Sequence, residues 1–189
     1  MAGKKVGVLA LQGDVSEHIR AFEAALGGDG EVVPVRTPAD LEGCDALAIP
    51  GGESTTLARL IAESGLREAI QTFKGGIFAT CAGMVLVATE INDSRFEPLG
   101  IVDITIERNA FGRQRESFEA GLAIEGLDEP FHAIFIRAPM ATAAGPGVEV
   151  LGRTEQGIVA VRCGKHMVLS FHPELGGDLR LHRTFLEAL

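Results

Sequence analysis

The sequence predicts an α/β fold in which helices flank a mostly parallel central sheet, with antiparallel strands added in the second half of the chain. Three observations support this prediction. Short apolar runs alternate with helix-period stripes through the first half. Glycine-rich or polar turns follow several of these runs, as at the carboxyl ends of parallel strands. In the second half, short strand-like runs are separated by close turns, a pattern typical of antiparallel strands.

The first predicted unit is a strand followed by a helix. Residues 6–11 form a near-continuous apolar run, which predicts a strand covered on both faces. Asp14, with Glu17 three residues later, resembles a capping box and predicts the helix start. One apolar stripe at helical spacing then follows, made of Val15, Ile19, Phe22 and Leu26. His18 lies beside the polar face of this helix, and we expect it at the surface.

The next units predict strands at residues 31–35 and 46–49, with a short helical turn at 38–41 between them. The second of these strands runs into Pro50-Gly51-Gly52-Glu53-Ser54-Thr55-Thr56, and a helix begins near Ser54. Paired glycines let the backbone approach a ligand and turn its N–H groups toward it. A plain strand-to-helix turn is the alternative. A phosphate-binding loop is disfavoured because no lysine follows the glycines.

Cys81 lies at an abrupt turn between a predicted strand, residues 77–79, and an apolar run of helix length. A nucleophile between strand and helix, with small neighbours, is the nucleophile-elbow pattern with cysteine in place of serine. The helix N-terminus would favour a thiolate and could hold an oxyanion. The alternative is a buried core cysteine, because free cysteine is among the most buried residue types.

The second half predicts six strands and a closing helix. The strands lie at residues 101–107, 117–124, 131–137, 148–154, 158–163 and 167–171. The closing helix is capped at Asp178 and carries one apolar stripe, Leu181, Phe185 and Leu189. With no repeat, low-complexity tract or linker in its 189 residues, the sequence predicts a single domain spanning residues 1–189.

Composition limits the classes of partner. The net charge is −9, from 17 basic and 26 acidic residues, and no basic run occurs, so nucleic acid is an unexpected partner. No apolar stretch reaches spanning length and the N-terminus lacks the apolar core of an export signal, so we expect a cytoplasmic protein without a membrane partner. Three cysteines without C-x-x-C spacing predict neither a disulfide framework nor a zinc site.

His172 is the predicted partner of Cys81. It ends an apolar strand, and Pro173 and Glu174 follow it. In extended chain, residues i and i+2 point to the same side, so Glu174 can hold the tautomer of the His172 ring, as the acid of a catalytic triad does. His132 and His166 border strands without an acidic companion at useful spacing, and His182 lies beside the apolar stripe of the last helix.

These features together resemble the class I, triad-type glutamine amidotransferases, which carry a Cys elbow and a late His-Pro-Glu. Within them the chain is most similar to the family of glutaminase subunits of pyridoxal 5′-phosphate synthase. The segments that carry this similarity are Gly7-Val8-Leu9-Ala10-Leu11-Gln12-Gly13, Pro50-Gly51-Gly52-Glu53-Ser54-Thr55-Thr56, Glu107-Arg108-Asn109-Ala110-Phe111-Gly112-Arg113-Gln114, Phe135-Ile136-Arg137-Ala138-Pro139 and Ser170-Phe171-His172-Pro173-Glu174-Leu175. Ala79 stands where the elbow pattern of the wider family has its first glycine.

The resemblance implies a flavodoxin-like three-layer sandwich, a glutaminase activity and a set of roles. Cys81, His172 and Glu174 would form the triad. Backbone N–H groups of Gly52 and Ala82 would form the oxyanion hole. The residues expected to hold glutamine are Gly52, Glu53, Ser54, Arg108, Ile136 and Arg137. No cofactor or metal is expected, and the partner would be a (β/α)8-barrel synthase subunit that receives the ammonia.

Two other interpretations of the same residues remain open. The first is another Cys-elbow hydrolase of related fold, such as a γ-glutamyl hydrolase or a DJ-1/PfpI-like protein; the His-Pro-Glu in the last strand argues against the latter. The second is a non-catalytic regulatory subunit that binds glutamine and signals through its partner. The intact set of Cys81, His172 and Glu174 weighs against it.

Overall fold

The computed structural model describes residues 3–108, 110–111 and 117–189. Its helices are α1 (Val15–Leu26), α2 (Pro38–Leu41), α3 (Ser54–Glu63), α4 (Leu66–Gln71), α5 (Ala82–Val87) and α6 (Arg180–Glu187), with a 3₁₀ turn η1 (Pro173–Leu175). Its strands are β1 (Lys4–Leu9), β2 (Gly30–Val35), β3 (Ala46–Ile49), β4 (Gly76–Thr80), β5 (Ala88–Ile91), β6 (Val102–Glu107), β7 (Ser117–Leu122), β8 (Phe131–Ile136), β9 (Met140–Ala144), β10 (Glu149–Arg153), β11 (Ile158–Cys163) and β12 (His166–Leu169).

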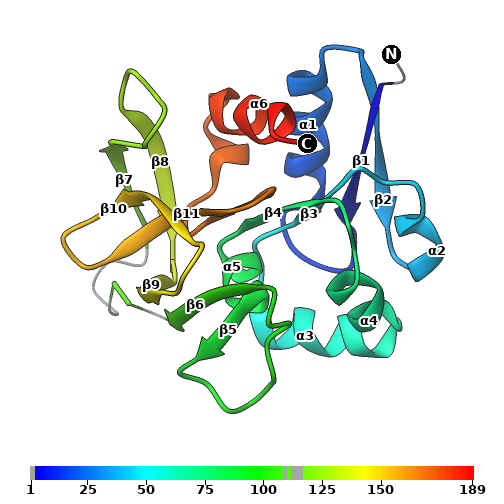
Figure 1. The fold of residues 1–189 in the computed structure, drawn as a ribbon, viewed down its shortest axis with the longest axis horizontal. Coiled ribbons are helices and arrows are strands. Elements are labelled where there is room, and N and C mark those ends of the chain that lie inside the picture. The colour runs from blue at the N-terminus through cyan, green and yellow to red at the C-terminus, as the bar shows by residue number, and fades with distance from the viewer. Residues whose placement is uncertain (1–2, 109, 112–116) are drawn as a thin grey trace.

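One long sheet organises the molecule, in the strand order β2-β1-β3-β4-β12-β11-β9-β6-β5, with β10 added beside β11 (Figure 1). The pairs from β2 to β12 are all parallel, whereas β11 and β9 run antiparallel to their neighbours. β7 and β8 form a separate antiparallel hairpin. The predicted fold class is therefore confirmed: the sheet is mostly parallel, and the antiparallel strands lie in the second half.

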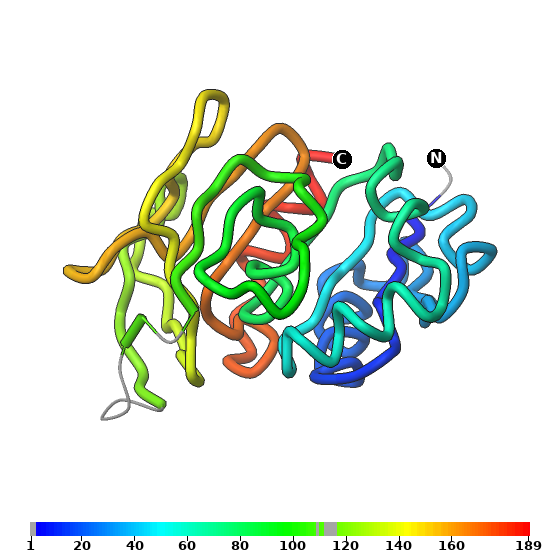
Figure 2. The backbone as a smooth tube through the Cα atoms, turned by 90° about the horizontal axis from the view of Figure 1, so that it is seen from below, coloured from blue at the N-terminus to red at the C-terminus, as the bar shows by residue number. Residues whose placement is uncertain are grey.

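Helices cover both faces of the parallel part of the sheet. α3, α4 and α5 lie on one face, and α1 and α6 pack together on the other (Figure 1). Seen from the α3 side, α6 lies behind the sheet (Figure 2). This arrangement makes three layers. Among the described residues, no helix has the length and apolar character that a membrane span requires.

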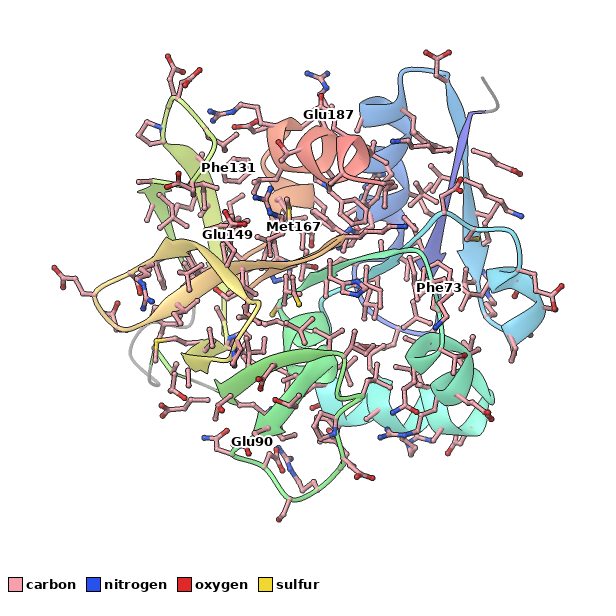
Figure 3. The ribbon with its side chains drawn as sticks, in the orientation of Figure 1. Phe73, Glu90, Phe131, Glu149, Met167 and Glu187 are labelled. Atoms are coloured by element: carbon pink, nitrogen blue, oxygen red, sulfur yellow. The ribbon has the colours of Figure 1, made fainter. Side chains whose placement is uncertain are left out.

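Successive side chains of each central strand enter opposite cores. In β3, Leu47 and Ile49 belong to the core under α3 and α5, and Ala46 and Ala48 belong to the core under α1 and α6. Near-continuous apolar runs result because both faces are buried. Figure 3 shows Met167 of β12 in the interior, where it is 2% exposed.

Two strands and one helix length differ from the sequence expectation. β5 and β9 were not predicted, and the apolar run after Cys81 forms a helix of only six residues before it continues as β5. β9 is alanine-rich and pairs with β6 and β11, so its conformation depends on tertiary pairing rather than on propensity. The capping box is also wrong: Asp14 occupies the N-cap of α1 without a side-chain cap hydrogen bond.

We predict that Gly83→Ala destabilises the protein, because α5 approaches β3 very closely. A Cβ at Gly83 would lie inside van der Waals contact of the Ile49 carbonyl oxygen. Overpacking of this kind costs about 1–3 kcal/mol, and each kcal/mol lowers the melting temperature by about 2–4 °C in a chain of this size. Gly121→Ala in β7 is the control, since its Cβ would meet Pro130 at an ordinary 3.7 Å. Equal melting temperatures for the two variants would contradict the close approach.

Candidate active site

Four chain connections converge at the carboxyl edge of the parallel strands. Asp14 follows β1, Gly51–Ser54 follow β3, Cys81 follows β4 and His172 lies just beyond β12. Because these four strands are neighbours in the sheet, their ends meet in one place. This is the region where open α/β sheets bind ligands.

Cys81 occupies a strained turn between β4 and α5. Its φ and ψ are 49° and −107°, and its N–H donates to the Leu169 carbonyl oxygen of β12 at 2.9 Å. The side chain is 7% exposed, and Sγ lies 3.7 Å from the Ile136 carbonyl oxygen. A non-glycine residue with positive φ stores strain that usually accompanies function. The strand–turn–helix context expected for a nucleophile elbow is therefore present, although α5 is shorter than expected.

His172 and Glu174 are bonded to each other beneath the surface. Nδ1 of His172 lies 2.7 Å from Oε1 of Glu174, and the two residues are 4% and 9% exposed. Burial opposes the charged form of His172, but hydrogen bonds to Asp14, Cys81 and Glu174 outweigh it and raise the pKa of the ring well above its usual range. Burial also opposes the charge on Glu174, yet the bonds to His172 and His18 lower its pKa to about 2. The pair therefore favours imidazolium beside carboxylate, and the hydrogen bond to Cys81 favours this charged ring as well.

His18 is fully buried, so the expectation that it lies at the surface is wrong. Its Nε2 lies 3.0 Å from Oγ1 of Thr80 and 3.4 Å from Oε1 of Glu174. The sequence carried the signal: Val15, His18 and Phe22 fall on one helical stripe, and that stripe faces the core.

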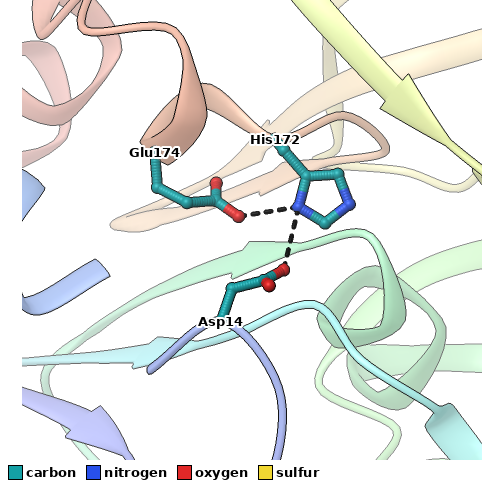
Figure 4. A group of neighbouring side chains, drawn as sticks. All are labelled: Asp14, His172 and Glu174. Carbon is teal, nitrogen blue, oxygen red and sulfur yellow. Dashed lines mark hydrogen bonds and ion pairs between the residues drawn. The ribbon is translucent and has the colours of Figure 1, made fainter. Parts of the chain in front are cut away.

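Asp14 was not predicted as a site residue, but its Oδ2 lies 3.2 Å from the same Nδ1 of His172 (Figure 4). Among the described residues, Asp14, His172 and Glu174 form the one group of three such side chains close enough to share a cation, with ligand atoms within 4.8 Å of one another. Because Nδ1 is already engaged by Glu174, we interpret the group as a hydrogen-bonded cluster. Its position after a strand at this edge of the sheet was the available signal.

A pocket of about 380 Å³ opens beside Cys81. Its lining consists of Gly52, Glu53, Ser54, Cys81, Ala82, Val85, Arg108, Arg137 and Pro139. It therefore gathers Cys81, both predicted oxyanion residues and most of the residues expected to hold glutamine. Ile136, the remaining one, is 37% exposed and turns its carbonyl oxygen toward the Cys81 thiol.

Two opposite charges are fixed at the wall of this pocket. The Glu53 carboxylate caps α3 by accepting from the Thr55 and Thr56 N–H groups at 3.1 and 2.8 Å. Burial raises the pKa of Glu53, but these bonds and the two threonine hydroxyls outweigh it and lower the pKa to about 2. Nη2 of Arg108 lies 3.3 Å from Glu53 Oε1, and Arg108 also pairs with Asp93. An amino acid carries both charges, so such a wall suits its carboxylate and ammonium groups.

Arg137 has a positive φ, as Cys81 does. Its φ is +45°, and these two are the only non-glycine residues with positive φ in the part of the chain that the structure describes. Both line the pocket. Four residues of the Glu107–Gln114 motif, Asn109, Gly112, Arg113 and Gln114, lie outside the described residues.

Sequence comparison matches residues 8–189 to the SNO glutamine amidotransferase family. A relative from Methanoregula boonei, named pyridoxal 5′-phosphate synthase subunit PdxT, is 63% identical over 98% of this chain and 98% of its own length. A second protein of that name, from Methanoculleus marisnigri, is 61% identical over 99% of this chain and 98% of its own length.

Structure comparison agrees with the sequence. A crystal structure described as a glutamine amidotransferase superposes with a TM-score of 0.89 at 48% identity, covering 97% of both chains. A crystal structure of a putative GMP synthase component from Thermoplasma acidophilum gives a TM-score of 0.71 at 14% identity, covering 100% of this chain and 92% of the other. The second likeness shows the shared fold alone. The family resemblance expected from the sequence motifs is confirmed.

We predict that the stability contributed by Glu174 is lost in acid. Its folded-state pKa, about 2, lies below the ~4.3 of an unfolded glutamate. The contribution is therefore fully present above about pH 4.3 and disappears as the pH falls toward 2. The difference in unfolding free energy between wild type and Glu174→Gln, measured by urea denaturation from pH 7 to pH 3, should shrink across this window.

The matched control is Glu63→Gln on α3, where the carboxylate forms an exposed pair with Arg59. Exposed pairs of this kind contribute little, about 0–1 kcal/mol, so its difference from wild type should stay small at every pH. A Glu174→Gln difference that is constant from pH 7 to pH 3 would show that the ionised carboxylate gives the fold no net stability.

Proposed function

The chain belongs to the SNO glutamine amidotransferase family, and we propose that it is the glutaminase subunit of a pyridoxal 5′-phosphate synthase. It hydrolyses the side-chain amide of L-glutamine and delivers ammonia to a partner synthase subunit. The observation that carries this proposal is the buried His172–Glu174 pair beside a strained Cys81 that lines a pocket. A nucleophile, a base and an acid that orients the base are the parts that amide hydrolysis by thiol requires.

The first half of the reaction forms a thioester. Nε2 of His172 takes the proton of the Cys81 thiol, and the thiolate attacks the side-chain amide carbon of glutamine. The resulting oxyanion accepts hydrogen bonds from the N–H groups of Gly52 and Ala82. When the tetrahedral intermediate collapses, the C–N bond breaks and the leaving nitrogen takes the proton from His172, so ammonia departs.

The second half regenerates the thiol. His172, now neutral, takes a proton from a water molecule as the water attacks the thioester carbon. The C–S bond breaks, the Cys81 sulfur recovers the proton from His172, and glutamate leaves. Glu174 stays ionised throughout and stabilises the imidazolium that forms twice in each cycle.

The residues that line the pocket are proposed to bind the substrate. The proposed contacts to the glutamine head group come from Gly52, Glu53, Ser54, Arg108, Ile136 and Arg137. The charge of Glu53 can attract the ammonium, the Ile136 backbone can accept from it, and the arginines can donate to the carboxylate. Arg108 already pairs with Glu53 and Asp93, so its remaining N–H groups would make the contact.

The partner is proposed to be a (β/α)8-barrel synthase subunit, with both proteins in the cytoplasm. Docking is expected near Gln12 and Gly13, at the carboxyl end of β1. This loop is hydrogen-bonded to the loop after β3, which carries the proposed oxyanion donor Gly52. The Glu53 N–H donates to Oε1 of Gln12 at 3.1 Å, and the Asp14 N–H donates to the Gly51 carbonyl oxygen at 3.2 Å. A partner that displaces the loop after β1 would therefore also displace the loop after β3.

Substrate choice separates this proposal from its rivals. A γ-glutamyl hydrolase would cleave γ-glutamyl peptides in preference to free glutamine, whereas a glutaminase would release ammonia from glutamine. A regulatory subunit would bind glutamine tightly without releasing ammonia. Measurements of glutamine binding, of ammonia release from glutamine and of γ-glutamyl peptide cleavage, all with the synthase present, therefore distinguish the three.

We predict that Cys81→Ala folds normally but loses glutaminase activity, because the thiolate forms the covalent intermediate. Removal of a triad nucleophile costs roughly 10⁶-fold in turnover in a comparable dissected triad. Thermal unfolding checks the fold, and ammonia release checks the activity. Activity within about tenfold of wild type, which is only ~1.4 kcal/mol of barrier, would remove Cys81 from the mechanism.

We also predict that the isolated chain is a poor glutaminase and that saturating synthase raises its turnover. Gly51 and Gly52 can rotate their shared peptide at low steric cost, with loss of the hydrogen bond from the Asp14 N–H to the Gly51 carbonyl oxygen, so one oxyanion donor can point away until the partner fixes it. Loss of one such donor costs roughly 100- to 1,000-fold. The measurement is steady-state turnover with and without synthase. Equal rates would contradict the gating while leaving the triad in place.

A further inference from the structure

The ring of His172 faces two carboxylates through a single nitrogen. Nδ1 lies 2.7 Å from Oε1 of Glu174 and 3.2 Å from Oδ2 of Asp14, and the two acids approach from different elements, η1 and the loop after β1 (Figure 4). One N–H makes one strong hydrogen bond at a time. Both negative charges nevertheless act on the imidazolium, since charges within 4–6 Å shift a pKa directly.

Asp14 is held in this position by its surroundings. It occupies the N-cap of α1, where an aspartate side chain normally accepts from the first-turn N–H groups, yet it makes no such bond. Its backbone is fixed at both ends, since its N–H donates to the Gly51 carbonyl oxygen and its own carbonyl oxygen accepts from the His18 N–H. A Cβ at Gly51 would fall 2.5 Å from Cε1 of His172 and 3.0 Å from Oδ2 of Asp14, so this glycine leaves room for the pair.

Glu174, by contrast, is shared between two rings. Its Oε1 also lies 3.4 Å from Nε2 of His18, which in turn contacts Thr80. Its other oxygen, Oε2, is buried and has no hydrogen-bond partner among the described residues. The charged or titratable groups around His172 are thus Asp14, Glu174, Cys81 and, through Glu174, His18. The carboxylate of Glu174 is therefore divided between His172 and a second histidine.

We propose that Asp14 is a second positioning residue, which shares with Glu174 the task of orienting His172 and stabilising its imidazolium. The catalytic part of this inference rests on the proposed glutaminase function. The effect of Asp14 on the charge and orientation of the His172 ring does not depend on that function. The proposal implies that either acid can accept the Nδ1–H when the other is removed. Loss of a single acid should then be mild, and loss of both should be severe.

The first test is a double-mutant cycle on the complex with its synthase. With one orienting acid in a triad, its loss costs about 10⁴-fold in kcat. We expect about 10- to 100-fold for Glu174→Gln, no more than about 5-fold for Asp14→Asn, and about 10⁴-fold for the double variant, which exceeds the product of the single losses, about 500-fold at most. Glu17→Gln is the control, because this carboxylate lies in the first turn of α1 and pairs with Arg20 instead. It should keep wild-type kcat.

The second test is independent of glutaminase activity. In a Cys81→Ser background, the His172 ring is titrated by ¹H–¹⁵N NMR, with His172→Gln used to assign its signals. Asp14→Asn should lower the His172 pKa by about 1 unit or more, since an anion at this distance stabilises the charged ring. Glu17→Gln should leave it unchanged, and Asp14→Glu should restore part of the shift.

The inference requires both results. An unchanged His172 pKa in Asp14→Asn, or losses that simply multiply in the double variant, would overturn it. A chain that titrates as expected but releases no ammonia would instead overturn the proposed function, and it would leave the Asp14–His172 contact standing. Melting temperatures of all variants separate a loss of positioning from a loss of fold.

Discussion

The parallel pairing of β4 with β12 is the contact on which the site depends. Thr80 pairs with Leu169, and the N–H of Cys81 donates to the Leu169 carbonyl oxygen at 2.9 Å. This register places the residue after β4 next to the residues after β12. Because Cys81 and His172 lie far apart in the sequence, a slip in this pairing would separate the Cys81 thiol from the His172 ring. The antiparallel strands β11 and β9 extend the sheet beyond β12 and bury its outer side.

The burial of the side chains around His172 determines how strongly their charges interact. His172, Glu174 and His18 all lie below 10% exposure, where charges are poorly screened and an unpaired polar group is costly. Pairing offsets part of that cost: one oxygen of Glu174 faces both histidines, and Asp14 adds a second anion at the more exposed end, although Glu174 Oε2 and His18 Nδ1 have no hydrogen-bond partner among the described residues. The same low dielectric strengthens each interaction with developing charge, so an arrangement that stabilises imidazolium in the folded state would also stabilise it during the proposed proton transfer.

The sequence predicted the parts of the site that follow from strand ends, and missed those that follow from packing. Cys81 and His172 were recognisable because each ends an apolar run, and Glu174 because of its i+2 spacing. The sequence predicted His18 at the surface because Ile19 beside it falls in the expected buried stripe of α1. In the structure the buried residues of α1 include His18 and Phe22, which lie on one face of the helix. Asp14 looked like a helix cap, and only the tertiary fold shows the histidine that its side chain faces. β5 and β9 were missed because their sequences carry no clear turn signal or strand propensity. Their strand conformation comes from tertiary pairing, of β5 with β6 and of β9 with β6 and β11.

The central claim is that Cys81 is the nucleophile and that glutamine occupies the pocket beside it. A glutamine analogue with an electrophilic diazoketone in place of its amide, followed by peptide mass spectrometry, tests this most directly. The account predicts one adduct per chain, on Cys81, slowed by free glutamine and nearly abolished in His172→Ala. Cys44 should stay unmodified, since burial raises the pKa of its thiol. Labelling of Cys44 or Cys163 with Cys81 untouched, or labelling that glutamine does not slow, would contradict the account.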